Sequence, residues 1–545
     1  MWRRAAAPAV VCALHGAALA YFWSASWIGF PHDDTLYLAA GKSLADGGGA
    51  VLPSLPGQPA QTKYPPLYPL LLAALWRMFG ELGGVLAGAF WLNWACGSAF
   101  LSGSFFLMRQ LGLDRRAALG LAALAAAHPA IIGLNVVLLS DMPFMALTVW
   151  ALAAAHWATQ GSWKTGMARW GRWCVVAGLL SLAVLTRSLG IATIAGVAGY
   201  GWFYRKKAPA ALAAMIAAAV FAAHSWWAWG HAAGLGESAS AGLRQTLLFY
   251  TSYGEFWRLC VPDWRTLGAV VLFNLREVVK EPAMECFLLP VAGFEGGLLQ
   301  MAAVAVSVGV MKGLAGLARE HGWHPAHAAL AVYVPLIVVW NYPLAGRFLL
   351  VFLPLFLAGA WGELSQLSAN AAKAFRGRAP RADRALCALF LAAVAALPAY
   401  AAYRIGCWSP RSLSRAVAQR EAAAPEYAEA MVWIRSRTRL EDRFIGYQDA
   451  RLYLETGRKA IRPMAFRTSA LYLQDKSILD GDLAGIKDVV RGVGARYWIR
   501  AEDDFHLEVG EQKIGPAVDE LLAGIPLVFR SSGGRVRIHD VSGMN

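Results

Sequence analysis

Long apolar stretches recur along the first 407 residues and are separated by short polar connectors. An apolar stretch of about 18 residues or more is long enough to cross the hydrocarbon core of a bilayer as a helix. The pattern therefore predicts a polytopic α-helical membrane protein with about eleven transmembrane helices. The expected spans are a first helix that ends near residue 27, followed by 84–108, 117–139, 142–160, 173–187, 188–204, 208–230, 296–316, 327–341, 348–363 and 386–403.

The remaining residues, 408–545, have a different pattern. Residues 425–437 have the apolar spacing of a helix, and the segments RFIGYQ, RYWIR, PLVFR and RVRIHD have the alternation of strands. This predicts a small soluble α/β domain that follows a membrane domain of residues 1–407. Its sequence contains no glycine-rich phosphate loop, no Gly-x-Ser-x-Gly motif and no cluster of metal ligands, so we assign no chemistry to it.

The composition agrees with this division. Apolar residues make up 57% of the 545 residues and charged residues 16%, with a mean hydropathy of +0.43. These values exclude a disordered chain, a collagen-like chain and a disulfide-rich scaffold, and they speak against a soluble multi-domain enzyme. The net charge of +15 lies almost wholly in the first 407 residues, which hold 29 basic and 16 acidic residues. Such an excess in the hydrophobic part indicates the positive-inside rule rather than a nucleic-acid surface.

The basic residues also predict an orientation. When the eleven spans alternate across the membrane, 18 basic residues fall on one side, which we expect to be cytoplasmic. The N-terminus then lies in the cytoplasm, and the loop 30–83, the segment 231–295 and the domain 408–545 lie on the periplasmic, extracytoplasmic side. The alanine- and arginine-rich composition and compact loops favour a bacterial inner (plasma) membrane as the location.

The outer loop 30–83 carries candidate chemistry. Asp33 and Asp34 directly follow the first span, and Tyr37 continues a helical spacing. Adjacent aspartates at such a place also serve as helix caps or solvated loop charges. Lys63 precedes a Tyr-Pro-Pro sequence that starts an amphipathic segment expected to lie on the membrane.

These motifs, in this order, resemble the GT-C superfamily of membrane glycosyltransferases. The chain is similar to the protein O-mannosyltransferase-like and aminoarabinose-transferase-like members, of the glycosyltransferase family 39 type. The resemblance is carried by DDTLY from Asp33, KYPPL from Lys63 and SDMPF around Asp141, with weaker matches at LTRSLG around Arg187, AGRFLL around Arg347 and RLYLETGRKA in the C-terminal domain. The chain departs from the family pattern in having Asp34 where Glu is more usual and one extra residue in KYPPL.

The resemblance implies an activity and roles for these residues. GT-C enzymes of this kind move a sugar from a polyprenyl-phosphate carrier to an acceptor on the outer face of the membrane. By similarity Asp33 is the general base of an inverting transfer and Asp34 its orienting neighbour, although either carboxylate could be the base. Binding of substrate or of the lipid phosphate is assigned to Lys63, Tyr37, Asp141, Arg187 and Arg347.

Alternatives exist for three of these side chains. Asp141 in a Ser-Asp-x-Pro sequence can simply cap a helix. Arg187 and Arg347, each at the expected outer end of a span, can snorkel or pair with an acid.

The expected partners are a polyprenyl-phosphate-linked sugar, with undecaprenyl or dolichyl as the carrier, and a glycan, lipid or protein acceptor of the cell envelope. The segment 231–295 is a candidate lid or acceptor groove, and nucleic acid is not expected as a partner. No cofactor is required, because lysine and arginine can neutralise the leaving phosphate. A divalent ion at His32, Asp33 and Asp34 is the alternative, although adjacent ligands on one loop rarely fill a coordination sphere. Cys260 and Cys286 are expected to be unpaired buried thiols, with a disulfide as the alternative.

Two other classes of function compete with this interpretation. A transporter or lipid translocator would place paired ionisable groups near the middle of the bilayer and often shows repeated halves, whereas here no repeat is visible and the acids gather at the outer boundary. A non-catalytic assembly scaffold would not need the acid pair, the Lys-x-Pro-Pro segment and the outer arginines on one side of the membrane.

Overall fold

The computed structural model describes residues 2–160, 166–204, 207–232, 239–289, 297–344, 346–376, 381–505, 508–509 and 512–544. Each of the eleven expected spans coincides with a helix or a bent pair of helices. In chain order they are α1 (Trp2–Phe22), α4 (Leu82–Gln110), α5 (Arg115–Ala126) with α6 (Pro129–Val136), α7 (Asp141–Thr159), α8 (Gly166–Thr186), α9 (Gly190–Phe203), α10 (Lys207–Ala232), α15 (Gly297–His321), α16 (Pro325–Val338), α17 (Leu353–Arg376) and α18 (Arg381–Tyr403).

These helices differ in length and hydropathy. In the described part of the chain, α4, α10, α15 and α17 with the short 3-10 helix before it are long and apolar enough to cross a membrane. The α5–α6 pair makes a fifth if it counts as one span bent by 52°. The bend falls at His128, whose side chain accepts the Ala130 N–H and caps α6, while Pro129 cannot continue the hydrogen-bond ladder of α5. The protein is thus a helical membrane protein of several apolar spans, and the crossing number of eleven stays a prediction.

The loop after α1 is folded rather than extended. It contains α2 (Asp33–Ala45), a single β-bridge between Val51 and Ala60, and α3 (Leu67–Phe79). The helix α3 begins directly after the double proline, as predicted, and packs on α2, where the Trp76 Nε1–H donates to the Leu38 carbonyl. The segment after α10 likewise folds into four short helices: α11 (Ala241–Thr251), α12 (Tyr253–Cys260), α13 (Trp264–Val278) and α14 (Glu281–Phe287). Cys260 and Cys286 are both buried free thiols.

The C-terminal domain is built on a five-stranded mixed sheet of order β2-β1-β3-β7-β6. The strands are β1 (Phe444–Gly446), β2 (Ala460–Ile461), β3 (Tyr497–Ala501), β6 (Leu527–Arg530) and β7 (Val536–Asp540); β1 pairs in parallel with β2 and β3, and β7 pairs antiparallel with β3 and β6. The helices are α19 (Ser409–Arg437), α20 (Asp449–Thr456), α21 (Ser469–Leu473), α22 (Lys476–Ala484), α23 (Ile486–Val493) and α24 (Ile514–Leu521).

The four expected strands and the expected helix are confirmed. The sequence missed β2 and the hairpin of β4 (Glu508–Val509) and β5 (Gln512–Lys513), because a strand of two residues shows no alternation.

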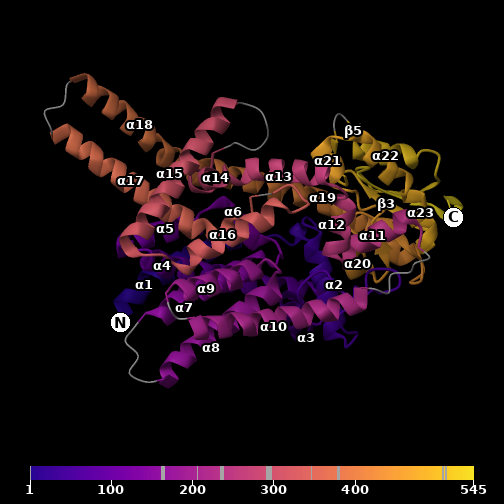
Figure 1. Cartoon of the computed structure of the whole chain (residues 1–545). Coiled ribbons are helices and arrows are strands. Elements are labelled where there is room, and N and C mark those ends of the chain that lie inside the picture. The colour runs from indigo at the N-terminus through magenta and orange to yellow at the C-terminus, as the bar shows by residue number, and fades with distance from the viewer. Residues whose placement is uncertain are drawn as a thin grey trace.

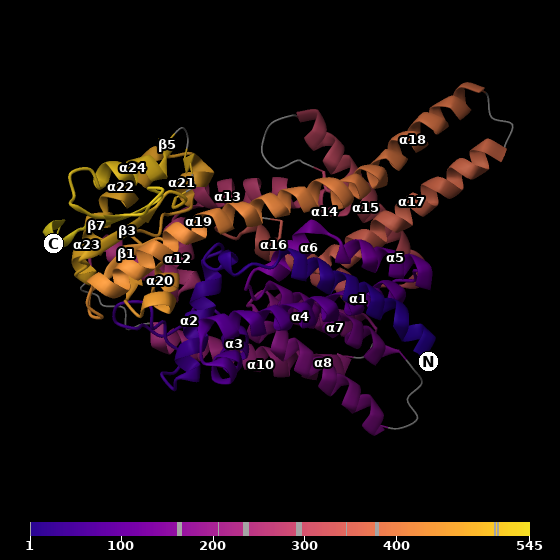
Figure 2. The ribbon, with the colours of Figure 1, turned by 180° about the vertical axis from the view of Figure 1, so that it is seen from behind.

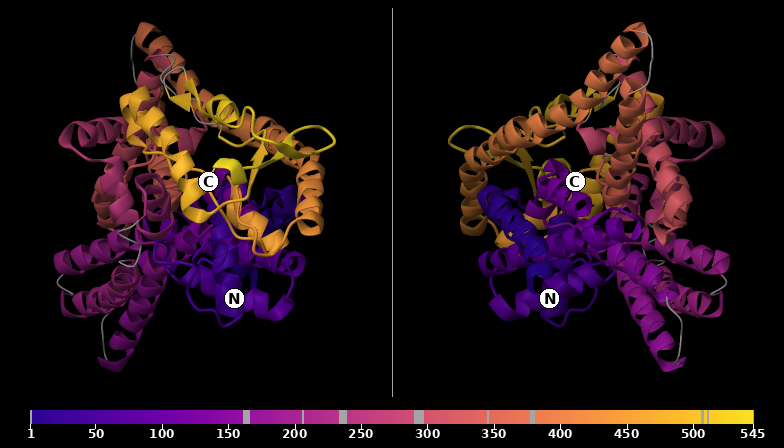
Figure 3. Two further views of the ribbon diagram at one scale, coloured as in Figure 1. Left: turned by 90° about the vertical axis from the view of Figure 1, so that its right-hand side faces the viewer. Right: turned by 90° about the vertical axis from the view of Figure 1, so that its left-hand side faces the viewer.

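The domain sits on one end of the helical part, and the two termini lie at opposite ends of the molecule (Figures 1 and 2). From the π-helical turn Arg404–Trp408, the long helix α19 runs back along the bundle to the sheet (Figure 2). Seen end-on, the domain covers only part of the bundle (Figure 3). It contacts α2, α11 and α13, and hydrogen bonds join the two parts, for example from Ala460 N to the Ser54 carbonyl at 2.9 Å.

Candidate active site

The acid pair follows a tight turn that begins at Gly29, whose φ of +84° suits a residue without a Cβ. Both carboxylate oxygens of Asp34 accept backbone hydrogen bonds, from Gly29 N at 2.9 Å and from Thr35 N at 2.6 Å. Burial raises the pKa of Asp34 to about 7 even though these two donors favour its ionised form. Asp34 is therefore placed inside the turn, where it holds the backbone together, and not on an accessible surface.

His32 closes this turn in a conformation that side chains with a Cβ rarely adopt, with φ at +56°. Its Nε2–H donates to Asp449 of the C-terminal domain at 2.7 Å, and its ring centroid lies 6.0 Å from that of Phe249 and 6.0 Å from that of Tyr250. Burial, with the positive charge of Arg462, lowers the pKa of His32 and keeps the imidazole neutral. Contacts from two other parts of the chain thus stabilise the strained residue directly before Asp33.

Asp33 is the first residue of α2 and is half-buried. One of its oxygens accepts a hydrogen bond from the Tyr64 hydroxyl at 2.9 Å. Burial opposes ionisation of Asp33, but the charges of Lys63 and Arg347, together with His32 and the Tyr64 hydrogen bond, outweigh it, and the pKa of Asp33 is lowered. Asp33 is therefore a carboxylate at neutral pH, with one oxygen oriented by a tyrosine.

Lys63 lies in a cage of aromatic rings. Its Nζ is 4.0 Å from the ring centroid of Phe249 and 5.1 Å from those of Tyr64 and Tyr253. Cation–π contacts of this kind partly replace the water that a buried ammonium loses. Burial nevertheless lowers the pKa of Lys63 to about 8, with Asp33 opposing the shift. The Lys63 side chain forms no ion pair with any carboxylate in the described part of the chain.

A second group of polar side chains lies near α2, where α7 begins and α8 ends. Arg187, just after α8, forms an ion pair with Asp141, the first residue of α7. The Tyr37 hydroxyl of α2 shares a hydrogen bond with the Ser140 Oγ at 3.0 Å. Arg187 thus pairs with an acid, which was the alternative to a role in substrate binding. Its partner is Asp141, which was itself predicted to bind substrate.

Aromatic rings lie between the group around Asp33 and the group around Asp141. The rings of Tyr37 and Tyr64 lie 4.8 Å apart, and Phe348 lies 5.6 Å from the guanidinium carbon of Arg187 and 5.4 Å from that of Arg347. The structure therefore brings six of the seven predicted residues into one region, while Asp34 points its oxygens into the turn. Arg347, like Lys63, forms no ion pair with a described carboxylate, so the region carries an excess of positive charge.

Sequence reasoning missed several members of this site. Phe249, Tyr250 and Tyr253 come from α11 and α12, within the segment expected to act as a lid or groove, and Asp449 and Arg462 come from the C-terminal domain. Aromatic and charged residues are frequent in both segments, and only the fold distinguishes these five. The domain to which no chemistry was assigned thus contributes side chains beside the site.

His32, Asp33 and Asp34 do not converge on one point that an ion could occupy. The His32 Nε2 is engaged by Asp449, and both Asp34 oxygens are engaged by backbone N–H groups. More generally, the described residues contain no group of three or more His, Cys, Asp or Glu side chains arranged to hold a metal ion. A reaction without a metal ion stays a prediction.

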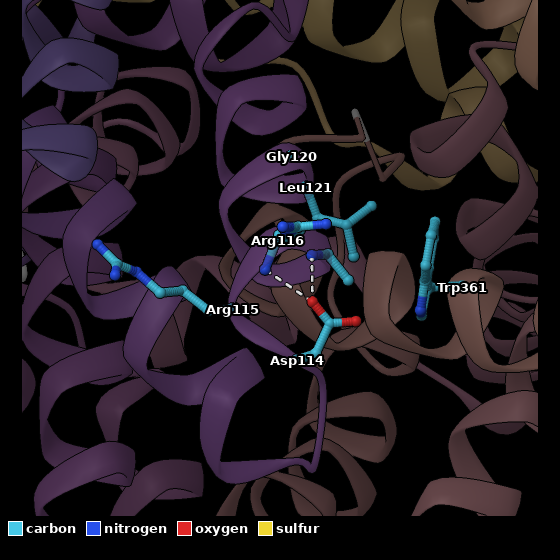
Figure 4. Close-up of a pocket in the computed structure, with 7 residues that line it drawn as sticks. Asp114, Arg115, Arg116, Gly120, Leu121 and Trp361 are labelled. Carbon is cyan, nitrogen blue, oxygen red and sulfur yellow. Dashed lines mark hydrogen bonds between the residues drawn. The ribbon is translucent and has the colours of Figure 1, made fainter. Parts of the chain in front are cut away.

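A wide groove lies elsewhere in the molecule, at the start of α5 beside α17 (Figure 4). Asp114, Arg115, Arg116 and Trp361 line it, and the Asp114 carboxylate caps α5 by accepting the backbone N–H groups of Arg116 and Ala117. None of the candidate site residues lines this groove, so we do not include it in the site.

No protein-family model and no curated protein sequence matches the chain. Solved structures do. ArnT from Cupriavidus metallidurans bound to undecaprenyl phosphate is 14% identical, with 97% of each chain covered and a TM-score of 0.54. The same enzyme in the apo state is also 14% identical, with 94% of each chain covered and a TM-score of 0.51. The archaeal oligosaccharyltransferase AglB from Archaeoglobus fulgidus, in complex with an inhibitory peptide and a dolichol-phosphate, is 14% identical, with 99% of this chain and 75% of that chain covered and a TM-score of 0.52.

This similarity extends over nearly the whole chain and includes both the helical part and the C-terminal sheet domain. At such low identity it establishes the fold: the predicted architecture, a helical membrane part followed by a small C-terminal α/β domain, is confirmed. The similarity does not distinguish between the two kinds of protein, since the TM-scores are nearly equal.

Proposed function

We propose that the chain is a membrane glycosyltransferase that moves a sugar from a polyprenyl-phosphate carrier to a cell-envelope acceptor. The observation that carries this proposal is the immediate surroundings of Asp33. An ionised carboxylate with one oxygen oriented by Tyr64 lies in the field of two cations, Lys63 and Arg347, that form no ion pair with a carboxylate among the described residues. A base beside an anion site is what this transfer needs.

In the proposed reaction Asp33 accepts the proton of an acceptor hydroxyl while the acceptor oxygen forms a bond to the anomeric carbon. The bond between that carbon and the phosphate oxygen breaks, and the polyprenyl phosphate leaves. Because the carboxylate and the phosphate act on opposite faces of the sugar, the transfer inverts the anomeric configuration. The oxygen of Asp33 that does not accept the Tyr64 hydrogen bond is the one assigned to the acceptor.

The phosphate changes from a diester with one negative charge to a monoester whose charge grows as it leaves. Lys63 and Arg347 are assigned to this growing charge because fixed cations in a partly dehydrated site stabilise it more strongly than water does. Arg187 is held by Asp141 and is assigned, with Tyr37, to the wall of the site that positions the substrate. The proposal needs no metal ion.

Two features support a lipid carrier. The site lies beside α2 at the start of α7 and the end of α8, two apolar helices. The structures with the same fold include one bound to undecaprenyl phosphate and one in complex with a dolichol-phosphate. We assign this face of the protein to the extracytoplasmic side, as the distribution of basic residues predicts. The alternative function, a transporter or lipid translocator, gains no support from this arrangement of Asp33 beside Lys63 and Arg347.

The test is sugar transfer by the purified full chain, with radiolabelled polyprenyl-phosphate sugars and crude cell-envelope acceptors. We expect Asp33→Asn to lower turnover at least about 100-fold, the size of contribution typical of a general base, while binding of the carrier is retained. Lys63→Ala is expected to weaken carrier binding as well as turnover. Incubation with EDTA is expected to leave turnover unchanged.

Matched controls come from the other end of the same helix. Lys42→Ala removes a cation of the last turn of α2, and Asp46→Asn removes the carboxylate that follows this helix; the two side chains pair with each other at 2.7 Å. They are expected to retain full activity. Wild-type turnover by Asp33→Asn would assign the base to another residue, and transfer that EDTA abolishes would contradict the metal-free reaction.

A further inference from the structure

The C-terminal domain places an arginine against the same aromatic ring that Lys63 contacts. Arg462 directly follows β2, the edge strand of the sheet, and its guanidinium carbon is 5.4 Å from the ring centroid of Phe249. The Lys63 Nζ is 4.0 Å from that centroid. Two cations from segments far apart in the sequence therefore lie near the same ring.

Arg462 has no carboxylate partner in the described part of the chain. The nearby carboxylate of Asp449 is already engaged: one oxygen accepts from His32 at 2.7 Å and the other from the Tyr250 hydroxyl at 2.9 Å. A half-buried guanidinium next to a buried ammonium repels it, and this repulsion is relieved when an anion binds to both.

The arginine is held in place before any ligand arrives. Its Nε–H donates to the Tyr447 carbonyl at 3.2 Å, and its guanidinium lies 4.0 Å from the Tyr447 ring centroid. Its backbone N–H donates to the Tyr250 hydroxyl at 3.3 Å, which ties the end of β2 to α11. The Nε–H is used by these contacts, whereas neither terminal guanidinium nitrogen donates a hydrogen bond to a described residue.

We propose that Arg462 is a further phosphate-binding residue, so that the carrier phosphate is held between the membrane helices and the C-terminal domain. This inference rests on the proposed function and adds the domain to the binding site: Lys63 and Arg347 contact the phosphate from the helical part, and Arg462 contacts it from the domain. A terminal –NH2 of the guanidinium donates to a phosphate oxygen in a charge-assisted hydrogen bond. The recognised chemistry is a phosphate ester.

The experiment measures the dissociation constant of undecaprenyl phosphate for the full chain in detergent, with phosphate-free undecaprenol as a second ligand. Arg462→Ala is expected to weaken binding of the phosphate about 10-fold or more, the scale of one lost charge-assisted contact, and to leave binding of undecaprenol unchanged. Arg462→Lys keeps a positive charge, and its affinity for undecaprenyl phosphate is expected to lie between those of the wild type and Arg462→Ala. A role confined to holding the domain would weaken both ligands alike, and that result overturns the proposal.

The control variant is Arg437→Ala, which removes an exposed arginine of the same domain at the end of α19 and is expected to bind both lipids as the wild type does. Lys63→Ala and Arg347→Ala distinguish a failure of the Arg462 assignment from a failure of the proposed function. If they lose phosphate binding while Arg462→Ala keeps it, the proposed function stands and the assignment of Arg462 is wrong. If the wild type does not distinguish undecaprenyl phosphate from undecaprenol, the proposed function fails, and this inference fails with it.

Discussion

At the scale of single residues, the site depends on how burial and charge act on Asp33, Asp34 and Lys63. Asp33 and Asp34 are adjacent, yet the pKa of Asp33 is lowered and that of Asp34 is raised to about 7. Burial raises both pKa values, and at Asp33 alone Lys63 and Arg347 help His32 and the Tyr64 hydrogen bond to outweigh it. Environments that separate the pKa values of paired carboxylates often mark a division of roles. Here Asp33 is suited to act as a base and Asp34 to hold the turn.

The lowered pKa of Lys63 predicts a pH dependence. Burial lowers this pKa to about 8, so the ammonium is charged below that pH and neutral above it. Binding of the carrier phosphate is therefore expected to weaken as the pH rises through about 8, while Asp33 stays ionised throughout. In Lys63→Arg the cation persists at high pH, and the alkaline loss of binding is expected to move upward by about one pH unit or more. The dissociation constant of undecaprenyl phosphate, measured from neutral pH to about pH 10, checks this.

Lys42→Arg, at a half-buried position in the last turn of α2, is the control and is expected to keep the wild-type profile. If Lys63→Arg lost binding of undecaprenyl phosphate over the same alkaline pH range as the wild type, a group other than Lys63 would be responsible for that loss.

At the scale of elements, small residues set how closely the helices pack. At the crossing of α15 and α17, a Cβ added at Gly313 would collide with the Gly359 carbonyl oxygen and lie 2.6 Å from the Glu363 backbone nitrogen. At the crossing of α9 and α16, Gly196 lies similarly close to Ala329. Glycine at such points lets two backbones approach and gain contacts that lipid chains would otherwise make. The approach of α15 also positions α17, whose preceding loop carries Arg347.

A pair of substitutions in α15 tests this packing. Gly313→Leu is expected to lower the thermal midpoint by several degrees, because overpacking costs about 1–3 kcal/mol and the nearest neighbours, of Gly359 and Glu363, are backbone atoms that cannot move aside. Gly309→Leu, four residues earlier, is the matched control, since a Cβ there would meet only Glu363 Cγ at 3.9 Å. Thermal unfolding of both variants in the same detergent gives the comparison. Equal midpoints would show that the crossing tolerates a side chain.

At the scale of the whole molecule, the C-terminal domain and the first loop form one structure. Asp449, at the start of α20, accepts hydrogen bonds from His32 before α2 and from Tyr250 of α11, and it is fully buried. Arg451 of the same helix donates to the Ile28 carbonyl at 3.3 Å. The domain therefore contributes to the turn that presents Asp33, and its removal is not expected to leave the site intact.

Asp449→Ala tests this coupling. The substitution leaves the polar groups of His32 and Tyr250 buried without their partner, which typically costs about 1–3 kcal/mol for each lost hydrogen bond. We expect faster amide hydrogen exchange in residues 29–38 and 246–252, together with weaker carrier binding. Glu441→Ala removes an exposed acid of the same domain and is expected to change neither. Wild-type exchange in both segments of Asp449→Ala would show that the domain is held by other contacts.

The sequence by itself determined the eleven helical segments, because the apolar periodicity of a span is a local property of 15 to 25 or so consecutive residues. It also determined the four longer strands, the start of α3 after two prolines, and the presence of Asp33 and Lys63 in one loop. Only the tertiary structure decided that Asp34 faces into a turn, that Arg187 and Asp141 pair with each other, and that Arg462 lies beside Lys63. These outcomes depend on contacts between residues far apart in the chain, and no local pattern encodes which distant charge or ring will fill a given space.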